Sequence, residues 1–273
     1  MKRLWGSLAV NALLIVAGAL AIAPLLWMVS VSLMRPGEAD SFPPPLVPGE
    51  PSLAAYRELF AHQGMGRYFA NSLVLACAAT VLSLGFNVTA GYAFAKLRFA
   101  GRDLIFQLLL GALVIPGQVA MIPLFLMLKG MGLVNNFGGV LIPAAAGVFG
   151  IFLVRQYALS IPDELLEAAR VDGAGEFRIF RSIVLPVLTP IMVTLATFTF
   201  LASWNDFMWP LIVLGDDKLY TLPVALASLS REHVQDAELM MAGAVVTVAP
   251  VLVLFVALQR YYIRGLLAGS VKG

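Results

Sequence analysis

Residues 68–95 read YFANSLVLACAATVLSLGFNVTAGYAFA, a run of 28 residues without Lys, Arg, Asp or Glu between Arg67 and Lys96. A membrane-spanning helix needs about 20 predominantly apolar residues. Each charge near its centre costs roughly 2.5–3.5 kcal/mol on insertion scales. A run this long and this free of charge therefore predicts a transmembrane helix.

The whole chain has the same apolar character. Of its 273 residues, 60% are hydrophobic and 12% are charged, and the mean hydropathy is +0.89. A soluble domain carries about 25% charged residues, and a core of this size could not enclose so much apolar surface. The composition argues against a soluble enzyme, a disordered chain and a nucleic-acid-binding protein, and it predicts an integral membrane protein.

Six stretches are long and apolar enough to cross a bilayer, so we predict an all-α membrane protein with about six transmembrane helices. The fourth stretch is the shortest and lies in a Gly-rich context. The predicted spans are Leu8–Leu33, Tyr68–Ala95, Leu104–Leu128, Gly138–Val154, Val187–Trp209 and Leu239–Tyr262.

The first span resembles a signal peptide, because Lys2 and Arg3 precede it and Ala21-Ile22-Ala23 resembles a cleavage site. However, the apolar run continues beyond that point to Leu33, and a proline would directly follow the cut. We therefore predict an uncleaved anchor.

The distribution of basic residues predicts the orientation of the chain. With six spans both termini share one side, which carries twelve of the eighteen Lys and Arg and only six of the sixteen Asp and Glu. The other side carries six bases and ten acids. Because the positive side faces the cytoplasm, both termini are predicted to be cytoplasmic.

The chain divides into two predicted regions. Residues 1–67 form the anchor helix and a Pro-rich extracytoplasmic loop with a short helix near Ala54–Ala61, and residues 68–273 form a transmembrane domain. Residues 210–238 form a second outer segment. The cytoplasmic loop at 155–186, between the fourth and fifth spans, departs most from the apolar pattern.

This inner loop holds a cluster of eight charged residues, and burying them in lipid would cost on the order of 20 kcal/mol. The segment therefore lies in water or against protein. Ser160 and Asp163 have the spacing of a capping box, and Pro162 fits the first turn of a helix. Gly173 is predicted to end that helix in a left-handed conformation. The charges are Asp163, Glu164, Glu167, Arg170, Asp172, Glu176, Arg178 and Arg181.

Apolar residues predict two amphipathic helices in the loop. The first carries a compact apolar stripe, with Glu167 and Arg170 paired at i,i+3. Leu185-Pro186 predicts the turn into the fifth span. The residues alone leave two interpretations open: a hairpin resting on the membrane surface, or a docking element that fits a cleft in a partner. The stripe is Leu165, Leu166, Ala168 and Ala169, and the second helix has Phe177, Phe180 and Val184 on one face and Arg178 and Arg181 on another.

A series of short motifs follows the chain in a fixed order. In the inner loop they are Glu167-Ala168-Ala169, Asp172-Gly173-Ala174, Phe180, Ile183, Leu185-Pro186 and Pro190. Elsewhere they are Gly91-Tyr92-Ala93-Phe94-Ala95 before Lys96, Arg155-Gln156, Trp204-Asn205-Asp206-Phe207, Trp209-Pro210-Leu211, Thr221-Leu222-Pro223, Gln259-Arg260-Tyr261, Arg264-Gly265 and Lys272-Gly273. Together they resemble the ABC-importer permeases, most closely the maltose-transporter-like permeases of the carbohydrate class, and the inner loop resembles their EAA loop. The resemblance covers roughly residues 70–273.

By this resemblance the protein would be one of two permease subunits that pair in the membrane, as a heterodimer, each docked on a cytoplasmic ATP-binding subunit. An extracytoplasmic solute-binding protein would deliver a sugar, polyol or oligosaccharide to the outer face. The chain would lie in the inner or plasma membrane of a prokaryote, form half of the translocation pathway and not be an enzyme. Closure of the ATPase would move the spans between inward-open and outward-open states.

The resemblance also implies roles for individual residues. Glu167 would be the polar anchor to the ATPase, Ala168 and Ala169 would allow close approach, and Gly173 would make the bend. The terminal Lys272-Gly273 would reach into the ATPase interface. The implied coupling residues are Glu167, Ala168, Ala169, Asp172, Gly173, Ala174, Leu185 and Pro186.

The sequence contains no pattern for chemistry of its own. It has no phosphate-binding G-x-x-x-x-G-K-[ST] loop, and Gly173-Ala174-Gly175 lacks the third glycine of a dinucleotide loop. His62 and His233 have no second metal ligand at helical spacing, and the single Cys77 allows no internal disulfide. We predict no catalytic residue, no metal site and no cofactor, and a membrane-embedded enzyme has no support.

The main alternative is an ion-coupled secondary transporter, because such proteins place ionisable residues within their spans. The nearest candidate is Asp206, which we interpret as an interfacial residue in an aromatic belt with Trp204 and Trp209. Pro116-Gly117 interrupts the third span, where we expect a kink packed against neighbouring helices. Co-purifying ATPase and binding-protein subunits favour the importer, and gradient-driven uptake by this chain alone favours the alternative.

Polar residues within the spans allow two hypotheses. They line the pathway, or they form hydrogen bonds between helices, which we favour. No residue pattern specifies the transported sugar. These residues are Asn71, Ser72, Asn87, Thr194, Thr197 and Thr199.

Overall fold

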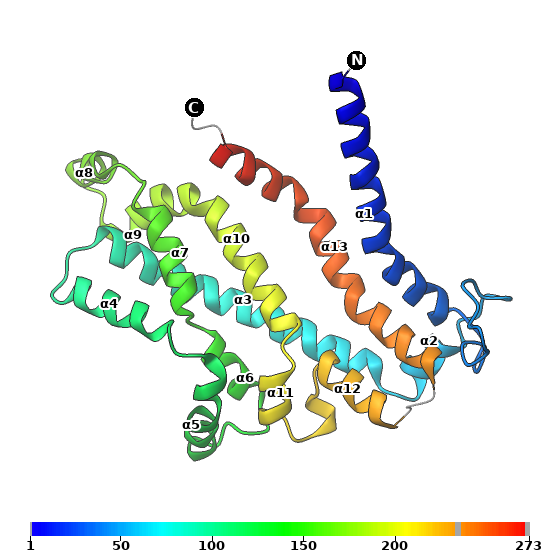
Figure 1. Cartoon of the computed structure of the whole chain (residues 1–273). Coiled ribbons are helices and arrows are strands. Elements are labelled where there is room, and N and C mark those ends of the chain that lie inside the picture. Colours follow the sequence, from blue (N-terminus) through cyan, green and yellow to red (C-terminus); the bar gives the residue numbers. More distant parts are fainter. Residues whose placement is uncertain (1, 233–235, 271–273) are drawn as a thin grey trace. The chain divides into compact units, whose positions relative to one another are not determined.

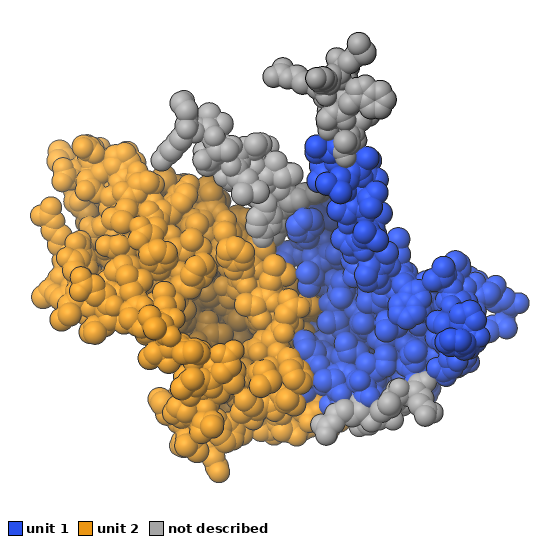
Figure 2. All heavy atoms as spheres, viewed as in Figure 1, with its two compact units in different colours: residues 1–69, 222–260 blue, residues 70–221, 261–273 orange. Residues whose placement is uncertain are grey.

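The computed structural model describes the backbone of residues 2–232 and 236–270, and every regular element in that part of the chain is helical. The all-α prediction is confirmed. The chain divides into two compact units, coloured blue and orange in Figure 2. Unit 1 comprises residues 1–69 and 222–260, and unit 2 comprises residues 70–221 and 261–273. The predicted ATPase-contacting tail, Lys272-Gly273, lies outside the described residues.

Unit 1 contains the N-terminal helix α1 (Lys2–Ser32), the short helix α2 (Ala54–Ala61), α12 (Leu222–Glu232) and most of α13 (Ala237–Ser270). The short helix has the bounds that the sequence predicted. Between α1 and α2 the chain has no regular helix. One contact fixes its path: the buried carboxylate of Glu238 on α13 accepts a hydrogen bond from the backbone N–H of Ala39 at 2.9 Å.

Unit 2 contains the remaining helices and the inner loop (Figure 1). The helix α3 begins in unit 1 and continues through unit 2. The elements are α3 (Met65–Lys96), α4 (Arg102–Ala112), α5 (Gly117–Gly130), α6 (Phe137–Ala144), α7 (Val148–Ala158), α8 (Asp163–Val171), α9 (Glu176–Ile179), the π-helix η1 (Phe180–Val184), α10 (Leu185–Trp204), α11 (Met208–Val213) and the 3₁₀-helix η2 (Asp217–Leu219).

Five helical stretches of the described chain are long and apolar enough to cross a membrane, and they correspond to five of the six predicted spans. The fourth is longer than predicted because α6 and α7 follow each other across a short break. The fifth ends earlier than predicted, at Trp204. The stretches are Val10–Ser32, Met65–Lys96, Phe137–Ala158, Glu176–Trp204 and Ala237–Ala257.

The predicted third span is broken more sharply than the expected kink. Helices α4 and α5 meet at 105°, because Pro116 adopts an extended conformation with ψ 130° and cannot donate a helical hydrogen bond. At a rise of about 1.5 Å per residue, each helix is shorter than the roughly 30 Å hydrocarbon core. The pair makes a sixth crossing only if its two halves together traverse the bilayer.

The fifth span starts inside the inner loop, so the turn predicted at Leu185-Pro186 is wrong. The chain stays helical from Glu176 to Trp204. Pro186 lies in the first turn of α10 and has no amide hydrogen, and the helix widens directly before it: the N–H of Leu185 bonds the carbonyl of Phe180 across a π turn.

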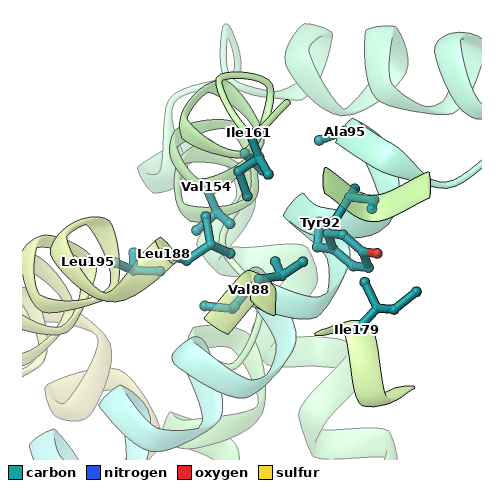
Figure 3. Packing of buried hydrophobic residues seen from close by; sticks show 11 residues of the cluster. Val88, Tyr92, Ala95, Val154, Ile161, Ile179, Leu188 and Leu195 are labelled. Atoms are coloured by element: carbon teal, nitrogen blue, oxygen red, sulfur yellow. The ribbon is translucent and has the colours of Figure 1, made fainter. Parts of the chain in front are cut away.

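One hydrophobic core joins the inner loop to the spans of unit 2. It contains residues from α3, α7, α9, η1 and α10, and Leu166 of α8 belongs to it. Figure 3 shows side chains of these elements converging. Loop and spans therefore share one buried surface. The buried members are Val88, Tyr92, Ala95, Val154, Ala158, Ile161, Leu166, Ile179, Val184, Leu188 and Leu195.

Candidate functional site

The candidate site is the inner loop, and its first helix begins at Asp163. The predicted capping box is absent from this described segment: the Ser160 hydroxyl donates to the carbonyl of Tyr157 at 2.7 Å, and Pro162 precedes the helix in an extended conformation. Asp163 and Glu164 occupy the first turn. No side chain caps the helix, and the negative charges of these carboxylates stabilise its N-terminus by interacting with the helix dipole.

Gly173 ends α8 as predicted, with φ +80° in the left-handed region. The N–H of Gly173 bonds the carbonyl of Arg170, and the N–H of Ala174 bonds that of Ala169, both at 3.0 Å. This pair of bonds is a Schellman motif. Ala174 then packs against the core, which fixes the path of the chain after the bend.

The apolar stripe predicted on α8 is divided between two faces. Leu166 is buried in the core and Ala169 packs against it. Four other residues of the helix are exposed and form what we call the α8 outer face; its apolar members include Leu165 at 44% and Val171 at 88% exposure. The outer face consists of Leu165, Glu167, Ala168 and Val171.

Glu167 and Arg170, predicted to pair, interact through their charges but form no direct ion pair. Arg170 instead donates to both carboxylate oxygens of Glu176, at 2.7 and 3.3 Å, because the bend at Gly173 brings α9 beside α8. The hydroxyl of Tyr92 on α3 donates to the same carboxylate at 3.5 Å. The carboxylate of Glu167 forms no hydrogen bond or ion pair with any other residue of the described chain.

Lys96 fastens the start of α8 to the end of α3. Its Nζ donates to the carbonyl of Ile161 and to Oδ1 of Asp163, both at 2.6 Å, and its side chain is only 6% exposed. The hydrogen bond and charge of Lys96 hold the pKa of Asp163 below its usual range. A lowered pKa means that this ion pair is fully formed at neutral pH and weakens only as the pH falls through that lowered value.

The second predicted helix is correct in place but differs in which side chains it buries. Ile179 and Val184 are buried, and Phe180 lies against the ring of Tyr92 with centroids 5.2 Å apart. Phe177 is 75% exposed, so the core covers only part of the predicted apolar face. Leu185 packs against the core, whereas Asp172 and Pro186 are exposed.

The structure thus adds three residues that the loop pattern could not supply: Tyr92, Lys96 and Ile179. Tyr92 and Lys96 lie on α3, more than sixty residues before the start of α8, and the signal that could have found Lys96 is its position as the first charge after a span. In the described residues no group of three His, Cys, Asp or Glu side chains could hold a metal ion.

Polar residues of the spans form bonds between and within helices. Asn71 donates to the carbonyls of Lys218 and Tyr220, and Ser83 bonds Thr199 of α10 at 3.2 Å. Thr194 and Thr197 bond carbonyls one turn earlier in their own helix. The interpretation of Trp204 and Trp209 as an interfacial aromatic belt around Asp206 is wrong, because Trp204 is fully buried and Trp209 is 8% exposed.

Comparison with known proteins places this geometry in a family. Residues 87–267 match the family described as binding-protein-dependent transport system inner membrane component. The match includes the inner loop and the helices packed on it.

Individual relatives agree with the family. The chain is 38% identical over 261 residues to the arabinooligosaccharides transport system permease protein AraQ of Halalkalibacterium halodurans, covering 93% of this chain and 92% of that protein. It is 34% identical to the melibiose/raffinose/stachyose import permease protein MelC of Bacillus subtilis, covering 92% and 91%.

A solved structure agrees as well. A chain of a bacterial ABC transporter involved in the import of the acidic polysaccharide alginate superposes with a TM-score of 0.83 at 25% identity, covering 95% of this chain and 97% of that chain. The chain described here therefore belongs to the binding-protein-dependent transport system inner membrane components and is a multi-pass permease subunit of a bacterial ABC importer.

Proposed function

We propose that this subunit forms half of the translocation pathway for a sugar or oligosaccharide and that α8 couples it to a separate ATPase. The observation that carries the coupling role is the division of α8: Leu166 is built into the core of the spans, while the outer face is exposed and the Glu167 carboxylate makes no hydrogen bond or direct ion pair within the described chain. A helix that is packed into the core of the spans on one side and exposed on the other transmits the movement of a bound partner to the spans.

The proposal also names the partners. Cytoplasmic ATP-binding subunits dock on the outer face of α8, with Glu167 as polar anchor and Ala168 allowing close approach, whereas Ala169 packs against the core. A second permease chain completes the pathway, and an extracytoplasmic binding protein delivers the solute. A related complex of a bacterial alginate ABC transporter contains a periplasmic protein bound to an alginate pentasaccharide; its chain shares the fold at a TM-score of 0.65.

Carbohydrate is the proposed cargo because the relatives named above are permeases for oligosaccharides. The test is to purify the complex in mild detergent, identify the chains that accompany this subunit, and measure uptake of a panel of labelled saccharides in proteoliposomes. We expect ATP-dependent uptake of at least one saccharide. Accumulation by this chain alone, driven by an ion gradient, would overturn the proposal and restore a secondary transporter.

The orientation gives a direct prediction. In a Cys77→Ala background, cysteine introduced by Pro44→Cys should react with a membrane-impermeant maleimide on intact cells. Cysteine introduced by Asp172→Cys should react only after permeabilisation. Both positions are exposed. This labelling result would mean that both termini are cytoplasmic.

The same labelling tests the bent pair. If α4 and α5 entered and left the membrane on one side, residues 44 and 172 would share a side and label together. That outcome would refute six crossings and place α8 away from the ATPase.

Charge reversal at Glu167 should remove the anchor. We expect Glu167→Lys to reduce ATP-dependent uptake to background and to prevent co-purification of the ATPase, with normal amounts of the chain in the membrane, because the exposed carboxylate supports no internal contact. Glu167→Gln, which keeps size and loses charge, should retain part of the uptake. Wild-type uptake by Glu167→Lys would contradict the docking role.

A further inference from the structure

A groove of about 860 Å³ lies beside α8 in unit 2. Its lining comes from α8, from Glu176 of α9, and from the end of α3, the start of α4 and the turn of residues 97–101 that joins them. Glu167 of the α8 outer face and Arg98 of the turn both line it. We propose that this groove receives a segment of the ATP-binding subunit, so that the docking surface extends from α8 to the turn between α3 and α4. The inference rests on the coupling role proposed above.

Most charges of the lining are neutralised within the chain. Three ion pairs do this: Lys96 with Asp163, Arg170 with Glu176, and Arg102 with Asp103. Arg98 and Glu167 are the exceptions. Both are exposed, and neither forms a hydrogen bond or a direct ion pair with another residue of the described chain. The groove therefore offers a partner one cation and one anion that no internal contact uses.

The backbone on both sides of Arg98 is fixed. Nη1 of Arg102 donates to the carbonyl of Leu97 at 3.3 Å, and the N–H of Arg102 bonds the carbonyl of Phe99 at 3.4 Å. The ring of Phe99 lies against that of Phe94 on α3, with centroids 5.7 Å apart. Because the turn is already ordered, a partner that binds Arg98 loses little free energy in ordering it.

Arg98 acts across the groove on α8. The hydrogen bond and charge of Lys96 hold the pKa of Asp163 low, and the charge of Arg98 lowers it further. Asp163 and Glu167 are one helical turn apart on α8. The free cation and the free anion thus belong to one groove. They match a protein segment that carries an acidic side chain for Arg98 and a basic side chain for Glu167, since complementary charges select the partner and its register.

The lining disfavours a phospholipid as the occupant. A phosphate group at Arg98 would meet the carboxylates of Asp163 and Glu167 in the same groove. The apolar residues of the lining, Ala95, Leu97 and Leu166, are buried or half-buried. Acyl chains would therefore find little apolar surface, on which lipid binding depends. The ATP-binding subunit, by contrast, is already proposed to contact Glu167.

Charge reversal in the complete complex tests the surface. Arg98→Glu should lower the amount of ATP-binding subunit that co-purifies in mild detergent, and ATP-dependent uptake in proteoliposomes, each about tenfold, because like charges then face each other. Arg98→Lys, which keeps the charge, should retain most of both. Arg178→Glu is the matched control: Arg178 is an exposed arginine of α9 that does not line the groove. It should behave as the wild type, and membrane levels should be normal in all three variants.

A photo-crosslinker identifies the occupant directly. With p-benzoylphenylalanine incorporated at Ala100, an exposed residue of the same turn, Arg98 stays intact. Irradiation of the complete complex should join this chain to the ATP-binding subunit. An adduct with lipid alone, or none, would overturn the extended surface, as would wild-type behaviour of Arg98→Glu or an equal loss in Arg178→Glu. If no ATP-binding subunit accompanies the wild type, the coupling role proposed above fails instead.

Discussion

Valine at position 173 is expected to abolish ATP-driven uptake while the chain still inserts into the membrane in normal amounts. Gly173 has φ +80°, where a β-branched residue is strongly disfavoured, and no atom lies within 4 Å of the Cβ that the substitution adds. The penalty is therefore one of backbone conformation, of about 1–3 kcal/mol. The bend relaxes, and both Schellman hydrogen bonds are lost. The outer face of α8 then points away from its partner.

Uptake in proteoliposomes, normalised to the amount of permease, measures this effect. Gly173→Asn is the control, since asparagine tolerates the left-handed region far better than valine and the space around the site is open. It should retain most of the uptake. Equal activity of the Val and wild-type proteins would show that the bend does not orient a docking surface.

Local signals explain what the sequence predicted correctly. An uninterrupted apolar run specifies a span through the cost of charge in lipid, as at Met65–Lys96. Gly173 specifies the end of α8 because the left-handed conformation is a property of a single residue. The short helix at Ala54–Ala61 also follows from its own composition. None of these features requires knowledge of what packs against them.

The features that the sequence analysis predicted wrongly or missed depend on contacts with residues of other helices. Arg170 pairs with Glu176 because two helices fold back on each other, and Lys96 bonds Ile161 and Asp163 across more than sixty residues. A helical pattern shows which residues share a face, but the core decides which face is buried, and so Phe177 is exposed while Ile179 is not. Proline at 186 predicts a turn locally, yet the helix continues through a π turn.

The candidate coupling residues also depend on tertiary contacts that the sequence pattern does not show. The sequence located the loop, and the EAA resemblance singled out Glu167, Ala168 and Gly173. It treated Leu165 and Leu166 as equivalent, although one is exposed and the other is 1% exposed inside the core. That difference separates a helix resting on the surface from one attached to the spans, and it depends on Ile161, Ile179 and other core residues that converge on Leu166.

The substitution Gly91→Leu is expected to destabilise unit 2 strongly. A Cβ at Gly91 would lie 2.7 Å from the Cβ and Cγ1 atoms of Val154 and 3.0 Å from the backbone nitrogen of Arg155. Overpacking usually costs about 1–3 kcal/mol. Here a backbone atom of α7 is part of the contact, so a rotamer change cannot relieve it and α3 must separate from α7.

Separation of these helices would also detach the coupling loop. Tyr92 and Lys96 follow Gly91 on α3, and they carry the hydrogen bonds to Glu176, Ile161 and Asp163. We therefore expect Gly91→Leu to lower the free energy of unfolding of the detergent-purified protein by about 3 kcal/mol or more and to abolish uptake.

Gly85→Leu is the matched control for this change. Gly85 lies on the same helix, and no atom lies within 4 Å of its added Cβ, so the same side chain enters open space. Its thermal unfolding should match that of the wild type. A Gly91→Leu protein that unfolds at the wild-type temperature would mean that α3 and α7 are not in close contact, and the attachment of α8 to the spans through Lys96 would then have no structural basis.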